Sequence, residues 1–96
     1  MANIIANLNK AFESRIRLGI MSILSVNASV DFNTMKELLE LTDGNLASHI
    51  KALEGLNYIQ SFKQFIGRKP NTNYSLTESG RQSFKEHLDA LETLIK

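Results

Sequence analysis

The sequence predicts a mainly helical α+β domain with one small β-hairpin, in the order α-β-α-α-β-β-α. Three observations predict it. Apolar residues recur at helical spacing along several segments of the chain. Ahead of the last of these segments the spacing changes to the alternation of strands, interrupted by the turn-forming run 67–71, "GRKPN". The length of 96 residues is that of one domain, residues 1–96.

The composition narrows the class of protein. The chain has no cysteine, so it forms no disulfide and no thiolate metal site, which fits a cytoplasmic protein. No stretch approaches the roughly 18 apolar residues of a membrane-spanning helix, so we expect no membrane partner. The net charge is only +1, but residues 43–70 carry four Lys or Arg against two Asp or Glu, whereas residues 77–96 carry three against four. A phosphate backbone would be attracted to the middle of the chain.

The first half of the sequence predicts a long helix and a very short strand. The helix is expected from about Ile4 to Val26, since apolar residues follow a helical stripe through it. Asn27 and Ser29 then favour a turn. Val30 and Phe32 alternate as a short strand would. The residues of the helical stripe are Leu8, Phe12, Ile16, Ile20, Ile23 and Leu24.

Two closely spaced helices are predicted next. Thr34 and Glu37 form a capping-box pattern for the first of them, with Asn33 as a competing cap. Thr42 or Asp43 can cap the second, which we expect to run to about Leu56, where Gly55 and Asn57 favour its end. The few residues between the two helices are typical of a helix-turn-helix.

A hairpin and a last helix complete the chain. Strands are expected over 58–66 and 72–76, with Pro70 and Asn71 at the centre of the turn beside the permissive Gly67. The aromatic residues of the hairpin, Phe62, Phe65 and Tyr74, are assigned to the core. Thr77 is expected to cap the final helix, in which Phe84, Leu88, Leu91 and Ile95 form a seam suited to another helix.

A helix-turn-helix followed directly by a β-hairpin is a winged helix. The segment 46–59, "LASHIKALEGLNYI", resembles the recognition helix of the ArsR and MarR families of regulators. The segment 67–81, "GRKPNTNYSLTESGR", resembles the wing of their small stand-alone relatives, whose "Y-x-L-T-x-x-G-R" run is matched by Tyr74, Leu76, Thr77, Gly80 and Arg81. The segment 16–24, "IRLGIMSIL", resembles their first-helix "R-L-x-I-L-x-x-L", with Arg17 in the Arg position and Met21 in place of Leu.

Helix 43–56 has a short polar face, as expected of a helix that enters the major groove. Asn45 can pair with adenine and Ser48 can donate or accept, while the resemblance implies that Ser48 and His49 face DNA. His49 could instead pack at the edge of the core, and Arg17 could contact phosphate or pair internally with a carboxylate. The wing, 65–71, is expected on the backbone or in the minor groove. The candidate DNA-binding residues are Arg17, Thr42, Gly44, Asn45, Ser48, His49, Lys51, Arg68 and Lys69.

Apolar side chains at both chain ends predict a second surface. They could cover each other within one molecule, or form a two-fold homodimer interface as in the families that the chain resembles. We expect the homodimer. The residues of this interface are Ile4, Ile5, Leu8, Leu88, Leu91, Leu94 and Ile95.

The function predicted is that of a homodimeric, sequence-specific double-stranded DNA-binding transcriptional regulator, more a repressor than an activator, on an inverted repeat. The alternative is a winged-helix protein-interaction module without DNA binding. RNA or single-strand binding would require exposed hairpin aromatics. An enzyme is not expected, since phosphate loops, nucleophile elbows and H-E-x-x-H are absent. No metal or cofactor is expected, because His49 and His87 fall on different helices. A small-molecule effector stays unknown; any effector would bind at the dimer interface or be another protein.

Overall fold

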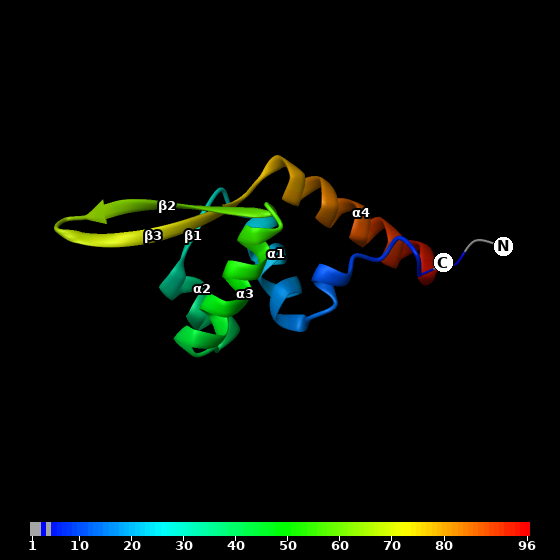
Figure 1. Cartoon of the computed structure of the whole chain (residues 1–96), viewed down its shortest axis with the longest axis horizontal. Helices are drawn as coiled ribbons and strands as arrows, with labels where there is room; N and C mark the ends of the chain where they lie inside the picture. Colours follow the sequence, from blue (N-terminus) through cyan, green and yellow to red (C-terminus); the bar gives the residue numbers. More distant parts are fainter. Residues whose placement is uncertain (1–2, 4) are drawn as a thin grey trace.

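The computed structural model describes residue 3 and residues 5–96, and its elements follow the predicted order (Figure 1). They are η1 (Lys10–Phe12), α1 (Arg15–Ser25), β1 (Val30–Asp31), α2 (Phe32–Leu39), α3 (Asp43–Gly55), β2 (Ile59–Ile66), β3 (Lys69–Leu76) and α4 (Glu78–Leu94). The strands form one antiparallel sheet in the order β1-β3-β2. The predicted fold class is therefore confirmed.

The molecule is elongated, with extents of 58 × 25 × 22 Å. Figure 1 shows the turn of the β2–β3 hairpin at one end of the long axis. The N-terminal segment and the C-terminal end of α4 lie together at the other end. The core fills the middle, where α1, α2 and α3 pack against one another and the base of the hairpin. Its fully buried side chains include Phe12, Ile20, Met21, Leu24, Met35, Leu46, Leu53 and Ile59.

The prediction of one helix from Ile4 to Val26 was wrong. Ile4 lies outside the described residues, and the helix α1 begins only at Arg15, because the Ser14 hydroxyl caps it by accepting from the Arg17 N–H at 3.3 Å. The chain before it makes the short 3-10 helix η1, capped by Asn9. The Asn9 N–H donates to Nδ1 of His87 on α4 at 2.9 Å, and its amide donates to the Tyr58 hydroxyl at 3.1 Å. These long-range bonds hold the segment across the core instead of along the axis of α1.

The predicted start of α2 was also wrong. Its cap is Asp31, whose Oδ1 accepts from the Thr34 N–H at 2.9 Å, so neither Thr34 nor Asn33 caps the helix. Phe32, expected in the strand, is the first residue of α2, because Asp31 already has the extended backbone of an N-cap. The two hydrogen bonds from Thr34 are also the main reason that the pKa of Asp31 is lowered.

The caps and ends of α3 agree better with the sequence. Thr42 is its N-cap and accepts from the Asn45 N–H at 3.2 Å, which settles the choice between Thr42 and Asp43. Asn57 ends the helix with a left-handed backbone, φ 61°. The Asn57 and Tyr58 N–H groups donate back to the carbonyls of Glu54 and Leu53, the paired bonds of a Schellman motif.

The hairpin turn lies three residues earlier than predicted. Ile66 pairs with Lys69, so Gly67 and Arg68 form the turn, and Gly67 supplies its left-handed φ of 65°. Pro70 is a strand residue that pairs with Phe65. β3 is flanked on its other side by β1 only at Asn73 and Tyr74, so a proline at position 70 meets an open edge and interrupts no central ladder.

One junction joins the base of the hairpin to α3 and α4, and we call Tyr58, Thr77 and Gly80 the corner. The Thr77 hydroxyl caps α4 by accepting from the Gly80 N–H at 2.8 Å and donates to the Asn57 carbonyl at 2.6 Å. The Thr77 N–H donates to the Tyr58 carbonyl at 3.1 Å. A Cβ at Gly80 would lie 1.9 Å from that carbonyl oxygen, so only glycine fits. The prediction that Thr77 caps the last helix is confirmed.

Neither a membrane span nor a metal cluster emerges from the described part of the chain. Its helices are all too short or too polar to cross a bilayer. Among the same residues, His, Asp and Glu side chains do not gather into a group of three or more that could hold a metal ion.

Candidate nucleic-acid interface

The helix α3 has a buried face and an exposed, short-chained polar face. Leu46, Ile50 and Leu53 point into the core. Asn45 and Ser48, three residues apart on the other side, are exposed. This face therefore presents hydrogen-bonding groups on side chains short enough to let the helix backbone approach another surface closely. Lys51, the third exposed residue of this face, adds a positive charge at its edge.

His49 and Arg17 form a pair beside this face. The Arg17 Nε–H donates to His49 Nδ1 at 3.1 Å, joining the first turn of α1 to the middle of α3. Because Nδ1 accepts, neutral His49 carries its proton on Nε2 and presents a donor there. Burial and then the charge of Arg17 lower the pKa of His49, so the imidazole is neutral at neutral pH. The arrangement supplies an N–H donor instead of a positive charge.

The structure thus gives Arg17 a partner that the sequence did not suggest. Arg17 takes part in none of the ion pairs formed by the described residues, so the internal carboxylate considered for it is not what it contacts. His49 is half-buried at the edge of the core, which agrees with the alternative that it packs there. Contact of either residue with DNA stays a prediction. A residue spacing of 32 gives no sequence signal for such a pair.

The N-terminus of α3 is open to solvent. Thr42 and Gly44 are exposed, and a Cβ at Gly44 would have no atom within 4 Å. The one carboxylate in the first turn, Asp43, is held by Lys36 of α2 at 2.7 Å. Its charge is therefore offset at the point where the partly positive helix terminus faces outward.

The tip of the wing is basic and, unexpectedly, apolar. We define the tip as residues 65–69. Arg68 and Lys69 are exposed there, as predicted. Phe65 and Ile66 are 71% and 66% exposed and Phe62 is 39% exposed, so the assignment of Phe62 and Phe65 to the core was wrong. Only Tyr74 of the three hairpin aromatics is buried. Eight-residue strands extend beyond the helices that could cover them, since each residue adds about 3.3 Å.

Phe65 and Ile66 were not among the functional candidates predicted from the sequence. The alternation of apolar and polar residues is the same in a strand that covers a core and in one that extends past it, so the pattern does not show which apolar residues are exposed. One available signal was the position of the turn. Since Gly67 is the residue suited to a left-handed turn, Phe65 and Ile66 directly precede it and lie too far out to be covered.

The residues predicted for a dimer interface lie at the opposite end of the molecule. Leu88, Leu91 and Ile95 of α4 and its C-cap are exposed, and so is Ile5. Leu8 and Leu94 are half-buried, and Ile4 lies outside the described residues. Phe84, placed in the same seam from sequence, is instead buried in the core against Phe12, with ring centroids 5.5 Å apart. The exposed stripe on α4 therefore starts at Leu88.

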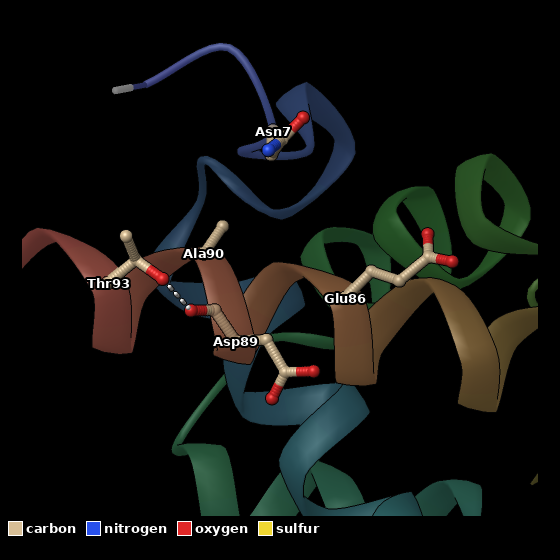
Figure 2. Close-up of a pocket in the computed structure, with 5 residues that line it drawn as sticks. All are labelled: Asn7, Glu86, Asp89, Ala90 and Thr93. Carbon is tan, nitrogen blue, oxygen red and sulfur yellow. Dashed lines mark hydrogen bonds between the residues drawn. The ribbon is translucent and has the colours of Figure 1, made fainter. Parts of the chain in front are cut away.

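A surface cavity of about 310 Å³ lies at this same end, between the N-terminal segment and α4 (Figure 2). Figure 2 shows Asn7 on the N-terminal segment across from Ala90, with Glu86 and Asp89 projecting from α4. The Thr93 hydroxyl is used within the helix, donating to the Asp89 carbonyl at 3.0 Å. With two carboxylates in its lining, the cavity is unsuited to an anion and is separate from the polar face of α3.

A short helix-turn-helix with an exposed polar second helix and a basic wing defines the class of winged-helix DNA-binding domains. The comparisons with known proteins agree with it. A family model described as a winged helix DNA-binding domain matches residues 16–95, so the chain belongs to that family. Its members are transcriptional regulators, not enzymes.

Individual relatives extend this likeness. The uncharacterized protein MJ0432 of Methanocaldococcus jannaschii is 36% identical over 87 residues, which cover 91% of this chain and 95% of that protein. The structure of a transcriptional regulator homologue from Pyrococcus horikoshii OT3 is 33% identical, with a TM-score of 0.77 and 90% of each chain covered. Reduced AbfR bound to DNA shares the fold at 17% identity, with a TM-score of 0.75 over 94% of this chain and 64% of AbfR. The predicted resemblance to winged-helix regulators is confirmed.

Proposed function

We propose that this winged-helix regulator binds a specific inverted repeat in double-stranded DNA as a homodimer and acts as a repressor by occluding the promoter. The observation that supports specific reading is the exposed polar face of α3, flanked by the basic wing. A major groove about 12 Å wide admits a helix only when the facing side chains are short. Asn45 and Ser48 meet that condition. The location that we propose for it is the cytoplasm.

Each residue on or beside that face would make a different contact with DNA. Asn45 would pair with a base edge, and Ser48 would donate to or accept from one. His49 would donate from Nε2 to a base acceptor or a phosphate oxygen, held in that tautomer by Arg17, whose outer nitrogens are suited to phosphate. Thr42 and Gly44 would bring the N-terminus of α3 to a phosphate. Lys51, Arg68 and Lys69 would contact the backbone.

The experiment that tests DNA binding is a salt titration with random-sequence duplex. The proposal expects log K to fall linearly with log salt, with a slope set by the number of phosphates contacted. A protein-interaction module has no need of the cations beside the polar face, and it would show no binding even at low salt. That result would favour the interaction-module alternative.

The homodimer is supported by the apolar stripe of Leu88, Leu91 and Ile95, which one molecule leaves exposed. A two-fold axis beside α4 would pack this stripe on its copy and would place two wings at the far ends, in keeping with an inverted repeat. Light scattering at micromolar concentration should give the mass of a dimer.

Leu91→Glu together with Ile5→Glu should lower that mass to the monomer's. Val26→Glu, at an exposed apolar residue just beyond α1, is the matched control and should leave the dimer intact. A monomeric wild type would refute the dimer.

A further inference from the structure

The tip of the wing carries apolar side chains on both of its faces. Consecutive residues of a strand point to opposite sides, so Phe65 and Ile66 face opposite ways. Phe65 shares its face with its cross-strand partner Pro70, and Ile66 shares the other face with Lys69. Both apolar residues are about two-thirds exposed. The tip therefore resembles a thin ribbon whose two sides would both gain from leaving water.

The positive charge around Phe65 and Ile66 indicates which kind of partner would bind the tip. From residue 55 to residue 77 the chain contains no Asp or Glu, while Lys63, Arg68 and Lys69 lie on the hairpin. The structure gives none of these three cations an ion pair among the described residues. A partner that complements the tip must be strongly anionic and must also offer apolar surface on two sides. Duplex DNA has both, since its phosphates border a groove walled by sugars, and the apolar faces of its bases become accessible where a base step opens.

Steric limits decide how the tip could enter. The minor groove is about 6 Å wide, whereas two paired strands already lie about 4.8 Å apart before their side chains are counted. The ribbon can thus lie across the phosphates, where its apolar groups gain nothing, or it can open the groove. Apolar wedges that enter a minor groove unstack a base step and bend the duplex toward the major groove, by roughly 20–90°.

We infer that the wing is a DNA-bending wedge, in which Phe65 and Ile66 enter the minor groove and open a base step while Arg68 and Lys69 hold the flanking phosphates. This inference rests on the proposed binding to duplex DNA and adds deformation of the duplex to it. The deformability of the DNA step under the wedge would then contribute to specificity without a base-edge hydrogen bond.

The test compares three variants on a site recovered by selection from random duplexes. Circularly permuted fragments report the bend, because a complex with a central bend migrates more slowly than one with a terminal bend. A 2-aminopurine placed in the site reports unstacking by its fluorescence. The wild type should give position-dependent migration and a fluorescence rise.

Phe65→Thr/Ile66→Thr should abolish both signals, while keeping the slope of log K against log salt, because no cation is lost. Threonine is β-branched and favours strands, so the hairpin should form. Val26→Thr removes the same kind of exposed apolar group away from the wing and should behave as the wild type. Arg68→Ala/Lys69→Ala should bind more weakly and with a lower salt slope, yet bend the DNA fully at saturation.

The outcomes separate the two proposals. A wild-type complex with straight DNA, or a bend that survives Phe65→Thr/Ile66→Thr, overturns the wedge and leaves duplex binding in place. Absence of duplex binding overturns both. Tighter binding to single-stranded DNA than to duplex, lost in Phe65→Thr/Ile66→Thr, also overturns the wedge, since it would mean that the aromatic ring stacks on unpaired bases.

Discussion

The two ends of the β2–β3 hairpin differ in almost every physical respect. At the corner, the chain is fixed by buried contacts and by three hydrogen bonds through Thr77, and even one added carbon atom at Gly80 would collide with the Tyr58 carbonyl. At the tip, residues 65–69 are all exposed to solvent. The same pair of strands is thus held by hydrogen bonds and close packing at one end and is exposed to solvent at the other.

The difference explains the "Y-x-L-T-x-x-G-R" motif. Tyr74 is buried, Thr77 caps α4, Gly80 permits the close approach, and the Arg81 guanidinium donates to the Ser25 carbonyl at 3.4 Å. Each of these residues serves the fold, and the motif as a whole orients the hairpin. The residues offered to a partner come just before it, at the tip. Substitutions at the corner should therefore change stability, and substitutions at the tip should change binding.

The largest effect is expected at the corner. Gly80→Ala should lower the free energy of unfolding by about 3 kcal/mol or more, because the added methyl meets backbone that cannot move aside. Urea unfolding followed by circular dichroism measures it. Gly55→Ala is the matched control, since a Cβ there meets nothing within 4 Å, and it should be neutral or stabilising by at most about 1 kcal/mol. Equal stability of the two variants would contradict the close approach at Gly80.

Substitutions on the polar face of α3 should change how the protein reads base edges in DNA, unlike substitutions at either end of the hairpin. Asn45→Ala and Ser48→Ala should each cost about 1–3 kcal/mol of specific DNA affinity per lost base contact, with non-specific affinity unchanged. Stability should change by only a few tenths of a kcal/mol, because both side chains are exposed and the Asn45 N–H keeps its bond to Thr42. Footprinting on a selected inverted repeat measures the affinities. Protection by both variants at wild-type concentrations would mean that this face does not read bases.

The cations of the tip should give a smaller effect per contact, and one that does not depend on the DNA sequence. Arg68→Ala/Lys69→Ala should flatten the slope of log K against log salt by about 0.9 per lost phosphate contact, or by about 3.6 for two contacts in each half of a dimer. Each contact is worth about 1 kcal/mol at physiological salt. Titrations on several unrelated duplexes should show the same change. An unaltered slope would mean that the tip is solvated in the complex.

The smallest expected effect is a dependence of stability on pH. It comes from histidines on the helices, since the hairpin contains none. Burial lowers the pKa of His87, which Glu13 only partly opposes, and its Nδ1 is occupied as an acceptor for the Asn9 N–H. In the unfolded chain His87 binds a proton near its ordinary pKa of 6.5, whereas in the folded chain it does so only at lower pH. Stability should therefore fall as the pH drops below 6.5 toward the lowered pKa.

His87→Gln, which can still accept from Asn9, should remove part of that slope in urea unfolding across this range. His49 contributes in the same direction, because burial and Arg17 lower its pKa too, so His49→Gln should remove another part. Asp31, whose pKa is lowered from 3.8, titrates outside this window. A slope that neither histidine substitution changes would contradict the assignment.

The sequence determined the features that depend on neighbouring residues. The helical spacing of Leu46, Ile50 and Leu53 is a property of one segment, and the structure buries all three. The caps at Thr42 and Thr77 are likewise local, since each hydroxyl bonds to an N–H three residues on. These signals, taken in order, were enough for the fold class and for the polar face of α3.

Three predictions of where an element begins or turns were wrong, because more than one position suited the local sequence equally well. The apolar stripe continues through the break before Ser14. The Ser14 cap and the long-range bonds of Asn9, one of them to His87, 78 residues away, end the helix there. Asp31, Asn33 and Thr34 can all cap a helix, and the pairing of β1 with β3 fixes the choice. Gly67 and Pro70 both suit a turn, and the register from Ile59 opposite Leu76 decides between them.

What the tertiary structure alone decided is which side chains meet and which are left uncovered. Alternation along β2 is the same at Ile59, which is buried under the helices, and at Phe65, which extends past them into water. The bond between Arg17 and His49 and the approach of Tyr58 to Gly80 join residues far apart in the chain. Local spacing fixes the conformation of a segment because its energies come from near neighbours. Burial and pairing come from the packing of whole elements, which no single segment encodes.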